Sequence, residues 1–164
     1  MQHTTRSATY LAGWALAGWT VILSGALLIP AGAEAARKNE EAAAAPTGPQ
    51  VSKGAVKKLQ AIQELVDKQQ YTEALEKLAE LEADKDKTPG DQFYVNRFRG
   101  FIYTRDEMRN YRAAADAYEA NLNSGLMPEG DVTGMLQLLA QLNLAGEPRN
   151  FGKAIEFGNR YLEA

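Results

Sequence analysis

Residues 109–118 read RNYRAAADAY, and forty positions further on residues 149–158 read RNFGKAIEFG. Residues 69–78, which read QQYTEALEKL, follow the same pattern more loosely. In all three segments an aromatic residue stands three positions before an alanine. These six signature residues are Tyr71, Ala74, Tyr111, Ala114, Phe151 and Ala154. Self-similarity at a fixed period indicates a repeat architecture, in which each repeat is one supersecondary unit that buries its apolar face against its neighbours.

Each repeat is predicted to be a pair of helices. In the first repeat, Leu59, Ile62 and Val66 fall on one helical face, and Leu78 and Leu81 fall on the apolar face of a second helix. No segment alternates apolar and polar residues for long enough to predict a strand. The apolar spacing therefore predicts an all-α fold, a short stack of antiparallel helix pairs.

The repeat boundaries follow from helix breakers. We divide the chain into repeats at residues 51–90, 91–130 and 131–164, because proline and glycine cluster near residues 90 and 130. Asp91 and Asp131 are the predicted N-caps of the helices that follow, since a short acidic side chain accepts hydrogen bonds from the free N–H groups of a first turn.

The aromatic-x-x-alanine pattern has a packing reason: a small residue lets two crossing helices approach, and the aromatic one turn earlier fills the space beside the turn. The pattern resembles the tetratricopeptide repeat, over residues 51–164. That family places a larger residue four positions after the alanine, where this chain has Leu78, Tyr118 and Gly158; Gly158 departs from the pattern. The period of 40 exceeds the family's 34 and implies longer turns. The resemblance implies a short right-handed α-solenoid of about three repeats.

The resemblance also implies a binding surface, because the first helix of each pair lines the concave face in that family. The alternative is that the aromatic residues of this set are core and its arginines are solvated. Arginine and aromatic side chains are suited to holding an extended peptide or its acidic groups. The candidate groove residues are Tyr94, Arg97, Phe101, Arg105, Gln137 and Gln141.

The N-terminal residues have the pattern of a secretory signal. Residues 8–29 contain no charged side chain, Arg6 precedes them, and Pro30 and several small residues follow. The pattern predicts a signal peptide over residues 1–33, cleaved after Ala33 or alternatively after Ala35. The rival prediction is a retained anchor helix, since 22 residues span roughly 33 Å. Residues 34–50, rich in alanine and proline, are the predicted flexible linker.

Composition bounds the function. The chain has 164 residues, a formal net charge of −3, no cysteine and a single histidine, His3. Without histidine or cysteine after the leader, the usual nucleophile–base pairs and zinc sites are absent, so we expect no enzyme activity, no cofactor and no metal. A mildly acidic chain without a basic stripe is not expected to bind nucleic acid.

Signal and repeats together resemble the exported, periplasmic tetratricopeptide repeat proteins of Gram-negative bacteria. The resemblance implies a non-catalytic scaffold of the cell envelope that binds another envelope protein or an extended peptide. The alternative is an accessory subunit of an envelope transport or assembly complex, anchored in the inner membrane with its repeats in the periplasm. The third repeat lacks a polar capping helix, which predicts either self-association through that repeat or a longer repeat array.

Overall fold

The computed structural model describes residues 48–164. Within them lie six α-helices and no strand: α1 (Lys53–Asp67), α2 (Tyr71–Glu82), α3 (Pro89–Tyr103), α4 (Tyr111–Asn123), α5 (Glu129–Ala145) and α6 (Phe151–Glu163). The prediction of an all-helical chain is thus confirmed for this part. The predicted N-terminal helix and residues 34–47 of the predicted linker lie outside the described residues.

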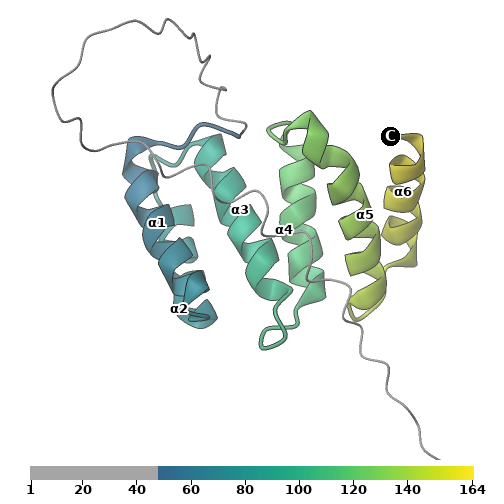
Figure 1. The fold of residues 1–164 in the computed structure, drawn as a ribbon, viewed down its shortest axis with the longest axis horizontal. Coiled ribbons are helices and arrows are strands. Elements are labelled where there is room, and N and C mark those ends of the chain that lie inside the picture. The colour runs from purple at the N-terminus through teal and green to yellow at the C-terminus, as the bar shows by residue number, and fades with distance from the viewer. Residues whose placement is uncertain (1–47) are drawn as a thin grey trace, which may run out of the picture. The chain divides into compact units, whose positions relative to one another are not determined.

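Consecutive helices pack as three helical hairpins, α1–α2, α3–α4 and α5–α6 (Figure 1). The hairpins stand in a row, and neighbouring hairpins touch mainly through α2–α3 and α4–α5. Residues 68–70, 104–110 and 146–150 connect the two helices of each hairpin. Short connections of this kind favour antiparallel neighbours, which is the arrangement seen in Figure 1.

The second helices begin forty residues apart, at Tyr71, Tyr111 and Phe151. The asparagine before the aromatic residue explains two of these starts. Asn110 Oδ1 accepts a hydrogen bond from the Ala113 N–H at 3.0 Å, and Asn150 Oδ1 accepts one from the Lys153 N–H at 3.1 Å. Each asparagine therefore caps its helix, and the repeated Arg-Asn-aromatic sequence is an N-terminal helix signal.

Equivalent positions of the three hairpins are buried. They are the signature alanine of each second helix and a branched apolar residue of each first helix. The buried residues are Ala74, Ala114 and Ala154 in the second helices, and Ile62, Ile102 and Leu142 in the first helices.

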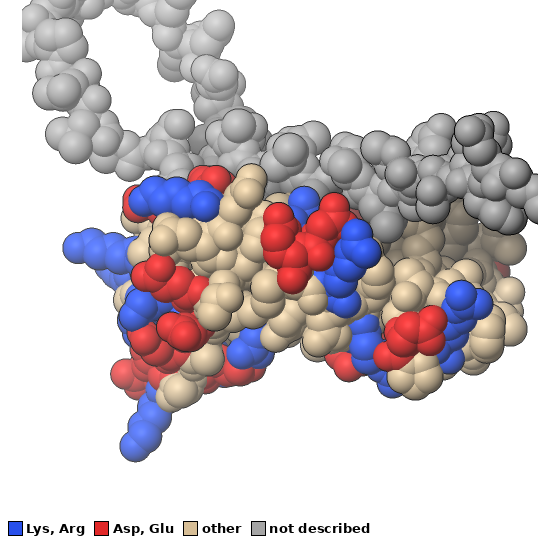
Figure 2. Space-filling model, turned by 90° about the horizontal axis from the view of Figure 1, so that it is seen from below, with Lys and Arg blue, Asp and Glu red and all other residues tan. Residues whose placement is uncertain are grey.

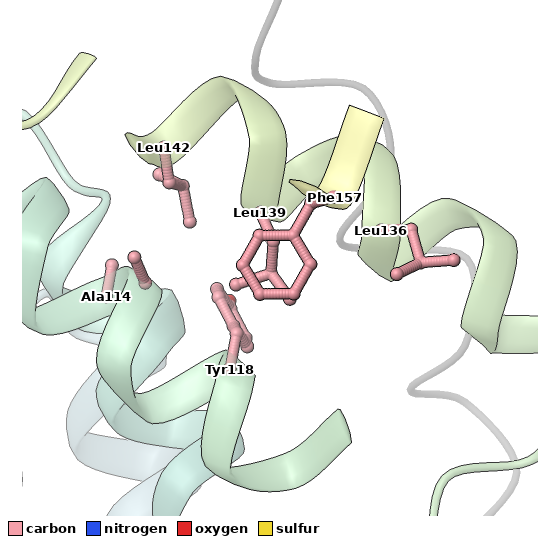
Figure 3. Close-up of a cluster of buried hydrophobic side chains, with 7 residues drawn as sticks. Ala114, Tyr118, Leu136, Leu139, Leu142 and Phe157 are labelled. Carbon is pink, nitrogen blue, oxygen red and sulfur yellow. The ribbon is translucent and has the colours of Figure 1, made fainter. Parts of the chain in front are cut away.

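The third hairpin compensates for the glycine at position 158. Where α4 has Tyr118, α6 has Gly158, and the neighbouring Phe157 points inward instead, with only 1% of its surface exposed. Figure 3 shows the Phe157 ring beside Leu139 of α5 and turned toward Tyr118 of α4. Burying such a ring contributes about 1.5–3 kcal/mol. The same cluster joins α4, α5 and α6 through Ala114, Ala115, Leu136 and Leu142.

A charged clamp fastens the first hairpin to the second. Arg99 of α3 donates to both carboxylate oxygens of Glu82 on α2, at 2.8 and 2.6 Å. The Gln92 amide donates to the same carboxylate at 3.3 Å. Two parallel N–H···O bonds from one guanidinium fix orientation as well as distance, so this pair adds a directed contact to the packing of α2 on α3.

The predicted N-cap roles of Asp91 and Asp131 are wrong. Helix α3 begins at Pro89 with Thr88 as its N-cap, and Asp91 is its third residue. Helix α5 begins at Glu129 after Pro128, which makes Asp131 its third residue as well. In α3, proline at the first helical position has its φ angle already set and lacks only an N–H that would be unpaired there. Both helices begin two residues before the aspartate.

Asp91 has a different role, because its buried carboxylate joins two segments. Its oxygens accept hydrogen bonds from the backbone N–H groups of Ser52, at 2.8 Å, and Thr88, at 2.9 Å. The chain just before Ser52 also packs on α3: a β-carbon on Gly90 would lie 1.9 Å from the Gln50 carbonyl oxygen. The end of the predicted linker is therefore held against the start of α3.

Candidate functional site

Four of the six candidate groove residues lie on one side of the second hairpin. Tyr94, Arg97, Phe101 and Arg105 follow one another at spacings of three and four, the first three on α3 and the last in the turn after it. Residues at these spacings share a helical face. All four are half-buried. We call these four residues the α3 strip.

Arg105 is held in place at the end of the strip. Its guanidinium carbon lies 4.1 Å from the centre of the Phe101 ring. Its Nε donates to the Phe101 carbonyl oxygen and one terminal nitrogen donates to the Thr104 hydroxyl, both at 3.3 Å. A cation stacked on an aromatic face keeps the edge of the guanidinium available for further hydrogen bonds.

Tyr94 and Arg97 form the other end of the strip. The Tyr94 ring meets the Phe93 ring edge-on, with centres 5.7 Å apart. Burial raises the pKa of the Tyr94 hydroxyl, and the positive charge of Arg97 acts in the opposite direction. Gly48 lies close to that hydroxyl, since a β-carbon on Gly48 would lie 2.7 Å from it. The tyrosine is therefore neutral at physiological pH and available as a hydrogen-bond donor or acceptor.

Tyr118 of α4 lies beneath the strip. Burial raises the pKa of its phenol to about 12, although the charges of both Arg97 and Arg105 act to lower it. The positive charges of both arginines therefore act on the pKa of this phenol. The strip consequently combines two cations and two aromatic faces above a neutral, buried phenol.

The arginines of the strip differ from the other arginines of residues 48–164. Neither Arg97 nor Arg105 forms an ion pair within this part of the chain. Each of the remaining five pairs with a carboxylate: Arg99, Arg109, Arg112, Arg149 and Arg160. A half-buried guanidinium that forms no ion pair can accept an external anion, and its planar fork matches a carboxylate.

The other two candidate groove residues are not part of the strip. Gln137 and Gln141 are exposed on α5, forty residues after Arg97 and Phe101. The backbones of α3 and α5 do not pack against each other. Helix α4 packs on both of them and separates them. The structure therefore places the four residues of the α3 strip on one side of the second hairpin, whereas the two glutamines lie on α5, whose backbone does not pack on α3.

The six signature residues serve packing to different degrees. The three alanines are buried, and Tyr71 and Tyr111 are half-buried, but Phe151 is 59% exposed. Four further large apolar side chains of the third hairpin are also exposed: Leu144, Ile155, Tyr161 and Leu162. The expectation that the third repeat lacks a capping helix implies an apolar surface of this kind, and the spacing of residues 151, 155 and 162 places part of it on one face of α6.

Several of the other charged groups of the described region form ion pairs, such as Lys58 with Asp84 and Lys153 with Glu119. On the face seen in Figure 2, acidic and basic side chains are interspersed rather than gathered by sign. Asp84, in a turn that superficially resembles the start of a calcium loop, accepts a hydrogen bond from Lys58 at 2.6 Å. Within residues 48–164 no group of three or more acidic or histidine side chains is arranged to hold a metal ion. None of the helices formed by these residues is long and apolar enough to cross a lipid bilayer.

Comparisons of the chain with protein-family models, with curated proteins and with solved structures found no match.

Proposed function

We propose that this chain is a non-catalytic protein-binding module in which the α3 strip binds an extended acidic segment of a partner protein. The observation that carries the proposal is the pair of half-buried arginines, Arg97 and Arg105, that have no carboxylate partner among residues 48–164. Charge-assisted hydrogen bonds from such groups to carboxylates contribute about 1.5–3 kcal/mol each. The aromatic rings of Tyr94 and Phe101 supply apolar contact between the two charges.

The proposed architecture is that of a short right-handed α-solenoid of tetratricopeptide-like hairpins. The forty-residue spacing of the second helices and the buried alanine in each of them support this assignment. In such an arrangement the first helices line one surface, which is where α3 carries the strip. Repeat scaffolds of this kind offer extended surfaces and need no chemistry of their own to function.

The proposed place of action is outside the cytoplasm, in the bacterial envelope. This part of the proposal rests on the sequence of residues 1–33, with its uncharged run and its small residues before the expected cleavage positions. The partner would then be another envelope protein with an acidic, extended segment.

Fluorescence anisotropy with two labelled peptides tests the binding proposal. One peptide alternates glutamate with leucine and contains one phenylalanine; the other replaces every glutamate with lysine. We expect the full chain to bind the acidic peptide, with an affinity that falls as salt is raised, and to bind the basic peptide weakly. Arg97→Gln or Arg105→Gln should weaken acidic-peptide binding about tenfold or more.

The matched control is Arg112→Gln, which removes the same charge from α4, where Arg112 pairs with Asp116 at 3.6 Å. This variant should bind as the unmodified chain does. Equal binding of the two peptides, or equal losses in all three variants, would contradict the proposed role of the α3 strip.

A further inference from the structure

The exposed face of α6 is a continuous apolar stripe. Phe151, Ile155, Gly158 and Leu162 succeed one another at spacings of four, three and four, so they lie along one side of the helix. Phe151, Ile155 and Leu162 are 59%, 64% and 81% exposed. We call these four residues the α6 stripe. It contains no charged residue, and the ion pair between Arg160 and Glu156, at 3.8 Å, uses other positions of the helix.

The same positions are covered on the preceding hairpin. Forty residues earlier, α4 has Tyr111, Ala115, Tyr118 and Leu122, all buried or half-buried. They belong to or pack on the apolar cluster to which α5 contributes its leucines. Among residues 48–164, α5 is the only helix whose backbone packs on that of α6. The α6 stripe therefore corresponds to the surface of α4 that packs on its neighbours. Within the described residues, no helix covers the stripe.

The first hairpin does not offer a matching surface for a head-to-tail contact. The exposed side of α1 carries Lys53, Lys57 and Lys58, with Val56 as its one exposed large apolar side chain. Covering the stripe with α1 of another molecule would bury these lysines against hydrocarbon, which is unfavourable without acidic partners. In the described region the only apolar surface of comparable extent is the third hairpin itself.

We propose that two copies of this chain associate through their α6 stripes, antiparallel and about a two-fold axis. The spacings of the stripe, four, three and four, are the same from either end of the helix. Each member therefore lies opposite another member when a second α6 packs antiparallel to the first. Ile155 then lies opposite Gly158 of the second copy, and Phe151 lies opposite Leu162. The glycine provides the space that the isoleucine fills, which permits close approach of the two helices.

Self-complementarity of this kind is what a two-fold interface requires, because the same patch must serve on both molecules. The contact goes beyond peptide binding and uses a different helix from the α3 strip. The pair would therefore present two α3 strips, and a partner with two acidic segments would bind it more tightly than it binds one copy.

Disulfide crosslinking tests the predicted pairing directly, because the chain has no cysteine of its own. Full-length Ile155→Cys and Gly158→Cys variants, mixed and mildly oxidised, should form a mixed dimer more readily than either variant alone. The control mixture is Lys57→Cys with Ala61→Cys, two exposed positions of α1, which should give only background crosslinking. Background crosslinking in the Ile155–Gly158 mixture as well would overturn the proposal.

Sedimentation of the full chain, which measures its oligomeric state, is the second test of the proposal. We expect a dimer at micromolar concentration, converted to a monomer by Ile155→Glu but not by Ala79→Glu, which adds the same charge at an exposed position of α2. Both variants should keep the unmodified helical circular dichroism, because both sites are exposed. A monomer at every concentration, an open-ended assembly, or a dimer that survives Ile155→Glu would each refute pairing through α6.

Discussion

The ring of Tyr118 on α4 lies directly against the backbone of Gly100 on α3. A β-carbon at position 100 would lie 2.5 Å from the ring carbon that bears the hydroxyl and within 2.7 Å of the two carbons beside it. The two helices can approach this closely because glycine has no side chain. The contact fixes the spacing within the second hairpin and places the phenol beneath the α3 strip.

Gly100→Ala is therefore expected to lower the free energy of unfolding by about 1–3 kcal/mol, the usual cost of overpacking. Urea denaturation followed by circular dichroism measures the change. In a Tyr118→Leu background the same glycine substitution should cost much less, because the ring that blocks the new methyl group is gone. A cost that is equal in both backgrounds would show that the two residues are not coupled.

Gly134 of α5 provides a matched control for that experiment. It is also a glycine inside a helix, but a β-carbon there meets nothing within 4 Å. Gly134→Ala should raise the free energy of unfolding by about 0.5–1 kcal/mol, because alanine loses less conformational entropy in a helix than glycine does.

The Tyr118 phenol should ionise above the ordinary tyrosine pKa of 10.0. Burial raises its pKa to about 12, so the folded chain keeps this proton at a pH at which the unfolded chain has lost it. The stability of the chain should therefore fall as the pH rises above the ordinary tyrosine value of 10.0. Phenolate absorbance during an alkaline titration measures this, and Tyr118→Phe should remove the last transition. A difference spectrum that titrates near pH 10 would refute the burial argument.

The buried Asp91 carboxylate should make stability depend on acid pH. Burial raises its pKa, but the hydrogen bonds from Thr88 and Ser52 outweigh burial and hold the pKa below the ordinary value of 3.8. Its stabilising contribution is thus complete above that value and is lost as the pH falls through the folded-state pKa. At neutral pH, Asp91→Asn should lower the free energy of unfolding by about 1.5–3 kcal/mol. Urea denaturation across the acid range should show this difference shrinking below about pH 4.

Asp131 is the control for Asp91. It occupies the same third position in α5 but is exposed, so Asp131→Asn should change stability by less than about 0.5 kcal/mol. A loss equal to that of Asp91→Asn would mean that the Ser52 and Thr88 contacts contribute nothing specific.

The helices and their register were largely predictable from the sequence. The apolar spacing predicted paired helices, and the forty-residue period predicted that residues 71, 111 and 151 hold equivalent places in the second helices, because these features depend on residues close together in the chain. The same period identified the buried alanines at positions 74, 114 and 154.

Contacts between distant segments were not predictable in this way. The bond from Ser52 to Asp91 joins residues 39 positions apart, and nothing in the local pattern near either residue indicates the other. The inward turn of Phe157 depends on the space left beside Tyr118 and Leu139. The exposure of Phe151, in contrast to Tyr111, depends on which helix covers it. Each of these features is set by three-dimensional packing rather than by local periodicity.

The proposed export of the chain predicts the composition of its mature form. Trp14 and Trp19 are the only tryptophans, and both precede the expected cleavage positions after Ala33 or Ala35. The processed protein should therefore begin at Glu34 or Ala36 by mass spectrometry and show tyrosine but no tryptophan fluorescence. Recovery of a form that starts at Met1 and fluoresces as tryptophan does would favour the retained anchor instead.

The central claim is that an acidic segment binds on the α3 strip and not elsewhere. A nuclear magnetic resonance titration of the isotope-labelled full chain with the glutamate-containing peptide tests it most directly. The backbone signals of residues 94–105, and the side-chain signals of Arg97 and Arg105, should shift most, while those of α6 stay in place. Saturable shifts centred on another helix, or no shifts in any helix, would contradict the claim.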